Sequence, residues 1–130
     1  MQKCKYLEDL GLKIEEYGTN FMSDDDPREA VWAKEREEYG FDNRETWNLD
    51  HIFIEWIYTR IMMYKDKTIA DTSFHKVPYK DKEITQGEAM DKILDLCKEI
   101  LLEKNDGKIC YENTREICDL WKEIVHLMWW

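Results

Sequence analysis

The chain has 130 residues and a mass of 15.9 kDa, which suits one domain of ordinary size. Its 29 acidic and 19 basic residues give a net charge of −10, whereas a general nucleic-acid binder needs a basic surface. The most apolar run, residues 52–64, falls short of the roughly 20 residues that span a membrane. We therefore expect a domain that can bury a core and that contacts neither a membrane nor nucleic acid directly.

The four cysteines lie apart in the sequence and form no CxxC pair. The N-terminus lacks the apolar stretch of a signal peptide, so a disulfide framework is not expected. Cys97 and Cys118 fall on apolar helix faces and are expected in the core. No ligand spacing predicts a metal site, and no glycine-rich loop or nucleophile elbow is present. We accordingly expect no metal and no cofactor, and we assign no catalytic residue.

A helix start follows an N-terminal segment, residues 1–23, that is expected to be loosely attached. Asp26 is expected to cap this helix, and Glu29 three residues later completes a capping box. The helix is predicted to run to Tyr39 and to end at Gly40. Few of its residues are strongly apolar, so most of its surface is expected to face water.

The segment 42–65 is apolar around most of its circumference, which predicts a central, buried helix. Trp47 and Leu49 are expected in the core. Asp50 and Arg60 project from the apolar side, where an unpaired charge is costly, so each must have a partner. They make either a structural ion pair or capping contact, or one or both line a polar pocket. The polar residues of this helix form one narrow stripe that is expected to face water. This stripe comprises Arg44, Asn48, His51, Glu55 and Thr59.

Residues 74–85 have the pattern of a small β-hairpin. Thr85 and Glu88 then form a capping box for a cleanly amphipathic helix, which is expected to end at residues 105–107. Asn113 is expected to start the last helix, whose apolar face extends to Trp129. The predicted fold is therefore all-α, a bundle of four to five helices with a small β-hairpin, in a single domain over residues 1–130.

Two regions have a charge pattern that predicts binding. Residues 60–82 have an excess of basic side chains together with exposed-type aromatics, and aromatic rings stack on bases while Lys and Arg bind phosphate. This combination predicts a site for a small anionic nucleotide. The expected ligand-binding residues are Arg44, Trp47, Asp50, Arg60, His75, Lys76 and Tyr79.

The first 50 residues are strongly acidic and could occupy a basic groove of another protein as a charge mimic. Six tryptophans are many for this length. Trp56 and Trp121 are expected in the core, whereas Trp130 falls on a polar helix side and could mark an interface. The expected partner-binding residues are Asp24, Asp25, Asp26, Glu35, Glu37, Glu38, Asp42 and Trp130.

The run Y-G-F-D-N-R-E-T-W-N-L-D resembles a family of small bacteriophage and prophage proteins that carry a G-F-D-x-R-E-T-W-x-L-D motif. The resemblance covers roughly residues 28–130, and it departs at Phe74, where a tyrosine is expected, and near Val125, where a proline is expected. It implies a protein of the infected bacterial cytoplasm and supplies no mechanism. The matching segments are residues 39–50, 56–60, 74–76, 85–88 and 128–130.

These observations support three classes of function. The first is an accessory, counter-defence protein that inhibits a host or defence-system protein through its acidic surface. The second is a sponge that sequesters a small nucleotide immune signal. The third is a nucleotide hydrolase, or else a homo-oligomer with an assembly role. We expect binding rather than catalysis, since only isolated acid–base candidates are present.

Overall fold

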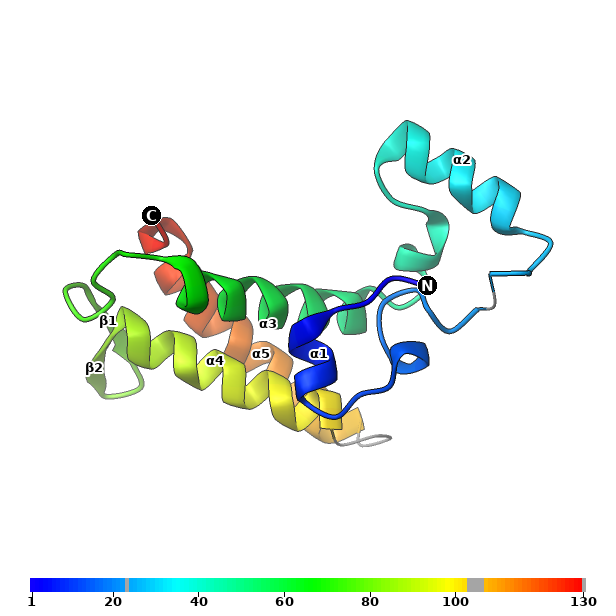
Figure 1. Cartoon of the computed structure of the whole chain (residues 1–130). Coiled ribbons are helices and arrows are strands. Elements are labelled where there is room, and N and C mark those ends of the chain that lie inside the picture. The colour runs from blue at the N-terminus through cyan, green and yellow to red at the C-terminus, as the bar shows by residue number, and fades with distance from the viewer. Residues whose placement is uncertain (23, 103–106, 130) are drawn as a thin grey trace. The chain divides into compact units, whose positions relative to one another are not determined.

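The computed structural model describes residues 1–22, 24–102 and 107–129. These residues form five α-helices, three short 3-10 helices and one two-stranded antiparallel sheet, so the predicted mainly helical fold with a small hairpin is confirmed (Figure 1). The chain divides into two compact units, Met1–Trp56 and Ile57–Trp130, here called unit 1 and unit 2. That the chain is one domain stays a prediction. Within the described ranges, no helix is long and apolar enough to span a bilayer.

Unit 1 consists of short elements joined by turns. Its helices are α1 (Lys5–Asp9), η1 (Ile14–Glu16), α2 (Glu29–Tyr39), η2 (Asn43–Thr46) and the first part of α3 (Leu49–Lys67). The large apolar side chains that it buries are few for its length. They are Tyr6, Leu7, Leu12, Tyr17, Trp32 and Ile54. Polar contacts must therefore contribute much of the stability of its loops.

Helix α2 begins two residues later than predicted, with Arg28 in place of Asp26 at the N-cap position. Asp26 accepts a hydrogen bond from the Arg28 amide at 2.9 Å, and the Glu29 carboxylate pairs with Arg36 instead of closing a capping box. The predicted end of the helix is confirmed. Gly40 has φ +86°, a left-handed conformation that glycine adopts without strain, and its amide binds the Arg36 carbonyl at 2.9 Å.

The helix predicted for residues 42–65 is interrupted. Asp42 caps the 3-10 helix η2 by accepting from the Arg44 amide at 3.1 Å, and α3 begins only at Leu49. Because a 3-10 turn and a break precede α3, helical angles counted from residue 42 do not apply. Trp47 and Leu49, predicted in the core, are 50% and 64% exposed.

Part of the predicted polar stripe of α3 is buried, and part of its predicted apolar side is exposed. Glu55 and Thr59 are buried, whereas Trp56 is 43% exposed, and Asp50 and Arg60 are exposed. Apolar residues occupy several faces of this helix, so hydrophobicity alone does not choose the buried face. The predicted burial of Asp50 and Arg60 was therefore wrong, as was the exposure of Glu55.

Unit 2 is built from the rest of α3, strands β1 (Lys76–Tyr79) and β2 (Lys82–Thr85), α4 (Gln86–Leu102), α5 (Gly107–Ile124) and η3 (Val125–Leu127). In the hairpin Val77 pairs with Ile84, and both are buried. Helices α4 and α5 lie side by side and carry the core of the unit (Figure 1). The predicted capping box is confirmed, with Thr85 and Glu88 exchanging hydrogen bonds of 3.1 and 3.0 Å.

Helix α5 starts six residues before the predicted N-cap, Asn113. The side-chain Nδ2 of Asn113 instead donates to the Leu96 carbonyl at 3.2 Å and to the Glu99 carboxylate at 2.7 Å, which ties α5 to α4. Cys118 is exposed, contrary to its predicted place in the core, while Cys97 is buried as predicted. The predicted end of α4 at residues 105–107 falls largely outside the described residues.

The chain leaves the α-helical geometry at Val125, where η3 begins. As a result Trp129, predicted on the apolar face, is 75% exposed. Its indole N–H donates to the His126 carbonyl at 2.7 Å, and its own carbonyl accepts from the Tyr64 hydroxyl at 2.6 Å. The exposed ring is thus held by contacts within unit 2.

Candidate functional site

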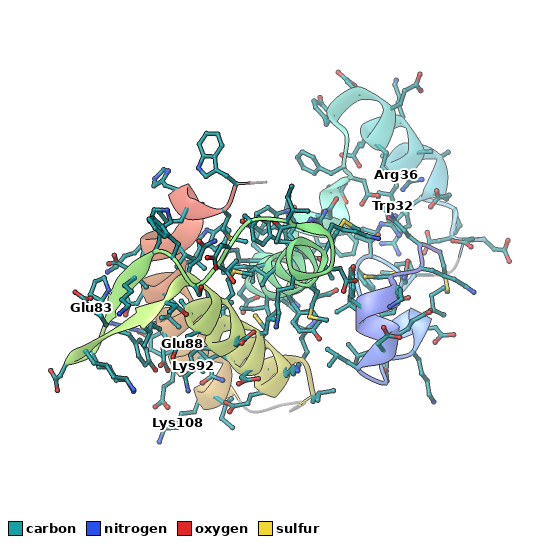
Figure 2. All side chains as sticks on the ribbon, turned by 60° about the vertical axis from the view of Figure 1, so that its left-hand side comes forward. Trp32, Arg36, Glu83, Glu88, Lys92 and Lys108 are labelled. Carbon is teal, nitrogen blue, oxygen red and sulfur yellow. The ribbon has the colours of Figure 1, made fainter. Side chains whose placement is uncertain are left out.

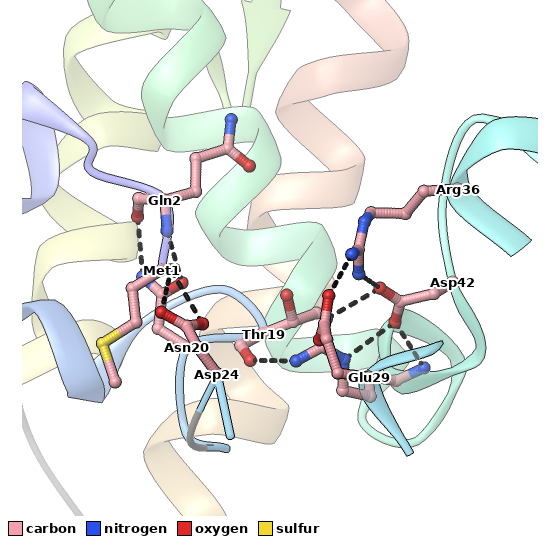
Figure 3. Close-up of polar contacts among 9 residues, drawn as sticks. Met1, Gln2, Thr19, Asn20, Asp24, Glu29, Arg36 and Asp42 are labelled. Atoms are coloured by element: carbon pink, nitrogen blue, oxygen red, sulfur yellow. Dashed lines mark hydrogen bonds and ion pairs between the residues drawn. The ribbon is translucent and has the colours of Figure 1, made fainter. Parts of the chain in front are cut away.

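A buried carboxylate in unit 1 is bound by two arginines. Asp42 is 2% exposed and accepts hydrogen bonds from Nε and Nη2 of Arg44, at 3.0 and 2.8 Å, and from Nη1 of Arg36, at 2.7 Å (Figure 3). Burial opposes the ionisation of Asp42, but the hydrogen bonds from Arg44 and Arg36 outweigh it and lower the pKa below its usual value. Asp42 therefore stays charged and acts as a structural anchor.

The Arg44 side chain joins three segments of unit 1. Its guanidinium carbon lies 4.2 Å from the ring centroid of the buried Trp32, and its Nη1 donates to the Thr19 carbonyl at 2.9 Å. Arg28 also approaches the Trp32 ring, at 5.0 Å. Trp32 and Arg36 lie one turn apart on α2 and reach the same network (Figure 2). Arginine–aromatic and arginine–carboxylate contacts thus replace the apolar packing that unit 1 lacks.

A hollow of about 220 Å³ lies next to this network. Phe21 and Trp47 form aromatic walls with ring centroids 5.9 Å apart, and each side chain is about half exposed. The Trp47 and Trp32 rings also lie in a T-shaped arrangement, with their centroids 6.3 Å apart. We call this feature the aromatic hollow. Its lining residues are Glu16, Gly18, Phe21, Arg44, Trp47, Asn48, His51 and Ile52.

A second buried carboxylate, Glu55, touches two of the lining residues. Both of its oxygens accept from the Gly18 amide, and Nε2 of His51 lies 3.6 Å from its Oε2. Burial raises the pKa of Glu55, against the lowering effects of the Gly18 hydrogen bond and of His51. The turn at Gly18 and the first turns of α3 are thereby fixed to each other.

The first two residues of the chain are held to Asn20 and Asp24 by polar contacts. The backbone of Gln2 exchanges two hydrogen bonds with the Asn20 side chain, at 2.9 and 2.7 Å, and the Met1 ammonium pairs with Asp24 at 3.0 Å (Figure 3). A hollow of about 210 Å³ lies here. Its lining residues are Met1, Gln2, Thr19, Asn20, Met22, Asp24, Glu29, Arg36 and Arg44.

Two of the predicted ligand-binding residues, Arg44 and Trp47, line the aromatic hollow. Asp50 is exposed in the first turn of α3, where its Oδ1 accepts from the His51 amide at 2.8 Å. Arg60 belongs to the other unit, on an exposed position of α3, where its Nη1 donates to Thr59. The predicted set is thus spread over both units.

The remaining predicted ligand residues lie at the hairpin of unit 2. His75 and Lys76 are exposed, and the His75 ring packs edge-on against Phe74 at 5.0 Å. The Tyr79 hydroxyl donates to Glu116, a contact that raises the pKa of Tyr79 together with its burial. Tyr79 is therefore already engaged within unit 2.

The acidic residues predicted to bind a partner differ in exposure. Asp42 was predicted at the surface, and this is wrong because both arginines of the network enclose it. Asp26 pairs with Arg28 at 2.9 Å, whose hydrogen bonds lower the pKa of Asp26 to about 2. Glu35 is partly buried, and Trp130 lies outside the described residues. The exposed members are Asp24, Asp25, Glu37 and Glu38.

Sequence reasoning missed most of the aromatic hollow. Glu16, Gly18 and Phe21 come from a segment with weak periodicity, and nothing in the sequence pairs them with Trp47. The glycine offers the one local signal, since Gly18 has φ +62° and so marks a turn. Among the described residues, no group of three or more His, Cys, Asp or Glu side chains is placed to hold a metal ion.

The four cysteines are free thiols, and burial raises the pKa of Cys97 to about 12, which makes it unreactive.

In comparisons with family models, curated proteins and solved structures, nothing matches this chain. Its function is therefore inferred from the charges, contacts and exposed side chains of the two units.

Proposed function

We propose that the protein is a phage or prophage accessory protein that binds a host or defence-system protein in the infected bacterial cytoplasm and inhibits it through an acidic surface of unit 1. The observation that carries this proposal is the exposure of α2. Trp32 is its one buried residue, while Glu37 and Glu38 stand exposed next to the exposed rings of Tyr39 and Phe41. Exposed aromatic side chains are enriched at protein interfaces, whose rim is polar. The phage origin rests on the resemblance at residues 39–50.

The charge of unit 1 supports a basic partner. Acidic side chains outnumber basic ones about two to one between residues 1 and 56, whereas they are nearly balanced in unit 2. A surface with one dominant sign attracts the opposite sign and speeds association. A groove that binds DNA has the required positive charge, so such a groove is the kind of host surface that unit 1 fits.

The network around Asp42 argues against phosphate binding by Arg44. Two of the three guanidinium nitrogens already bind the Asp42 carboxylate, and the third binds the Thr19 carbonyl. A phosphate at this place would have to compete with a buried carboxylate. Sequestration of a nucleotide is the second candidate, because the exposed Trp47 ring beside a hollow offers a stacking surface.

Charge reversal on α2 tests the proposal. Wild-type protein, a Glu37→Lys/Glu38→Lys variant and a control Asp95→Lys/Glu112→Lys variant are purified by affinity from a lysate of the bacterial host and analysed by native mass spectrometry. Both variants change the net charge equally, and all four side chains are exposed. We expect one stoichiometric protein that the wild type and the control retain and the α2 variant loses. The activity of that protein should fall when purified wild type is added.

Three results would contradict the proposal. A partner retained equally by all three proteins would remove α2 from the interface. A partner whose activity is unchanged would remove inhibition. A compound of nucleotide mass released on denaturation, with no protein partner, would support the sponge instead.

A further inference from the structure

The aromatic hollow has a lining unlike that of an anion site. Its walls are the half-exposed rings of Phe21 and Trp47, and the exposed carboxylate of Glu16 lies at its margin. The face of an aromatic ring carries partial negative charge and attracts cations. The Glu16 carboxylate, which accepts from the Lys13 amide at 2.8 Å, places a negative charge in the lining. Both kinds of group favour a positively charged occupant.

The positive charge of Arg44 does not cancel this preference. Arg44 and Arg36 share the Asp42 carboxylate, at 2.8 and 2.7 Å. Arg36 also pairs with Glu29, so these two arginines and two carboxylates together contribute little net charge. The other buried carboxylate, Glu55, contacts the lining residues Gly18 and His51. The groups in and directly behind the lining therefore sum to a neutral or negative charge.

Unit 1 already uses the contact that such an occupant would make. Arg28 and Arg44 both stack near the ring of Trp32, at 5.0 and 4.2 Å from its centroid. Trp32 is buried, and its cations come from the same chain. Trp47, beside it, keeps half of its surface open to solvent and has only aromatic neighbours, Phe21 and Trp32, among its described ring contacts.

From the half-exposed rings, the carboxylates and the volume of the hollow, we propose that the aromatic hollow receives an arginine or lysine side chain of the protein partner. This inference rests on the proposed function, since it names the chemical group by which a basic partner would be recognised. The occupant stacks on Trp47 and Phe21 and directs its charge to Glu16. A hollow of about 220 Å³ has room for one such side chain.

The test uses a small probe in place of the partner. The 15N-labelled full-length protein is titrated at low ionic strength with Nα-acetyl-arginine amide, and the indole N–H signal of Trp47 and the backbone amide of Phe21 are followed by NMR. Nα-acetyl-citrulline amide, which has nearly the same shape and no charge, is the matched neutral probe. Nα-acetyl-glutamate amide is the anionic probe. We expect saturable shifts with the arginine probe only.

Three variants locate the site. Trp47→Leu should weaken binding of the arginine probe about fivefold, and Glu16→Gln about threefold, as the Phe21 amide reports. Trp47→Phe keeps an aromatic ring in the wall, and its affinity for the arginine probe should stay within about twofold of that of the wild type. This comparison distinguishes the loss of an aromatic ring from a general disturbance of the fold at position 47. The matched controls are Glu15→Gln, an exposed neighbour of Glu16, and Trp129→Leu, an exposed tryptophan of unit 2. Neither control should change the affinity.

Binding of the citrulline or glutamate probe as tight as that of the arginine probe would overturn the inference, as would an unchanged affinity in Trp47→Leu. These failures are distinct from a failure of the proposed function. If the arginine probe does not bind but Glu37→Lys/Glu38→Lys still loses the partner, the hollow is excluded and the acidic surface stands. If the probe binds but no protein partner depends on α2, the hollow stands and the proposed function is wrong.

Discussion

The two units of the chain are stabilised by different means. In α4 of unit 2 the apolar positions of the helical repeat are all buried, from Ala89 to Leu101. In unit 1 the buried set includes three charged side chains, Asp42, Arg44 and Glu55, while Trp47 stays half exposed. The difference shows that helical periodicity predicts burial when a helix has one apolar face, and fails where short turns are joined by ion pairs.

The largest effect should come from the core of unit 2. Leu120 on α5 is 2% exposed, and Leu120→Ala should lower the free energy of unfolding by about 3 kcal/mol, through lost burial and the cavity left behind. Chemical denaturation followed by circular dichroism measures the loss. Leu102→Ala makes the same change at a half-exposed position and should cost less than about 1 kcal/mol. Equal losses in the two variants would mean that α4 and α5 do not form a packed core.

The ion-pair network of unit 1 should respond almost as strongly to loss of one charge. Asp42→Asn keeps the side-chain size but leaves Arg44 buried without its carboxylate, which should cost about 2 kcal/mol at neutral pH. The folded pKa of Asp42 is lowered, so its contribution is present above the unfolded value and is lost as the pH falls through the folded value. The wild type should therefore lose its advantage over Asp42→Asn in acid.

Denaturation curves between pH 2 and pH 7 would check both points. Asp24→Asn serves as the control, because the Asp24 side chain is exposed and pairs only with the terminal ammonium among its described ion pairs. It should change the stability by less than about 0.5 kcal/mol. If Asp42→Asn and Asp24→Asn have the same unfolding free energy at every pH, the ion pairs of Asp42 do not stabilise unit 1.

A helix cap in unit 2 should have a smaller effect. Thr85→Ala removes the hydroxyl that accepts from the Glu88 amide at 3.0 Å, and should cost about 1 kcal/mol of unfolding free energy. Thr85→Ser keeps the hydroxyl and should stay close to the wild type. If serine and alanine are equally destabilising, the β-branched side chain and not the cap stabilises this junction.

The smallest effect at neutral pH should be that of Glu55→Gln, within about 1 kcal/mol and stabilising. The folded pKa of Glu55 is raised, so its favourable contribution is present below the unfolded value and is lost as the pH rises through the folded value. Glutamine keeps an oxygen for the Gly18 amide and has no charge to bury. The unfolding midpoint of Glu55→Gln should thus exceed that of the wild type above the ordinary carboxyl range, while Glu15→Gln follows the wild type.

The features of the fold that could be predicted are those determined by residues close together in the sequence. The hairpin, the Thr85–Glu88 cap and the apolar arc of α4 depend on residues close in sequence, and each was predicted. Gly40 ended α2 as predicted for the same reason. The face of α3 depends on a contact between Glu55 and Gly18, which are 37 residues apart, and no periodicity reports such a contact.

The site was harder to predict than the fold. Arg44 and Trp47 were singled out, but as groups that hold an anionic ligand, and the structure commits Arg44 to Asp42 and Thr19. Arg44 is buried because it lies in the 3-10 helix η2. The prediction of one continuous helix over residues 42–65 did not include this 3-10 helix. Phe21 was missed because only the folded turn at residues 18–21 brings it to Trp47.

The boundary between the units falls inside α3, between Trp56 and Ile57, and this has a consequence for dissection of the chain. A protease cleaves backbone that can open into an extended strand, and a peptide bond within a helix must first unwind. Limited proteolysis should therefore cut the chain at its surface loops and leave the junction of the units intact. An expressed N-terminal fragment would need to extend to Lys67 to contain the whole of α3. A fragment that ends at the boundary between the units would contain only part of this helix.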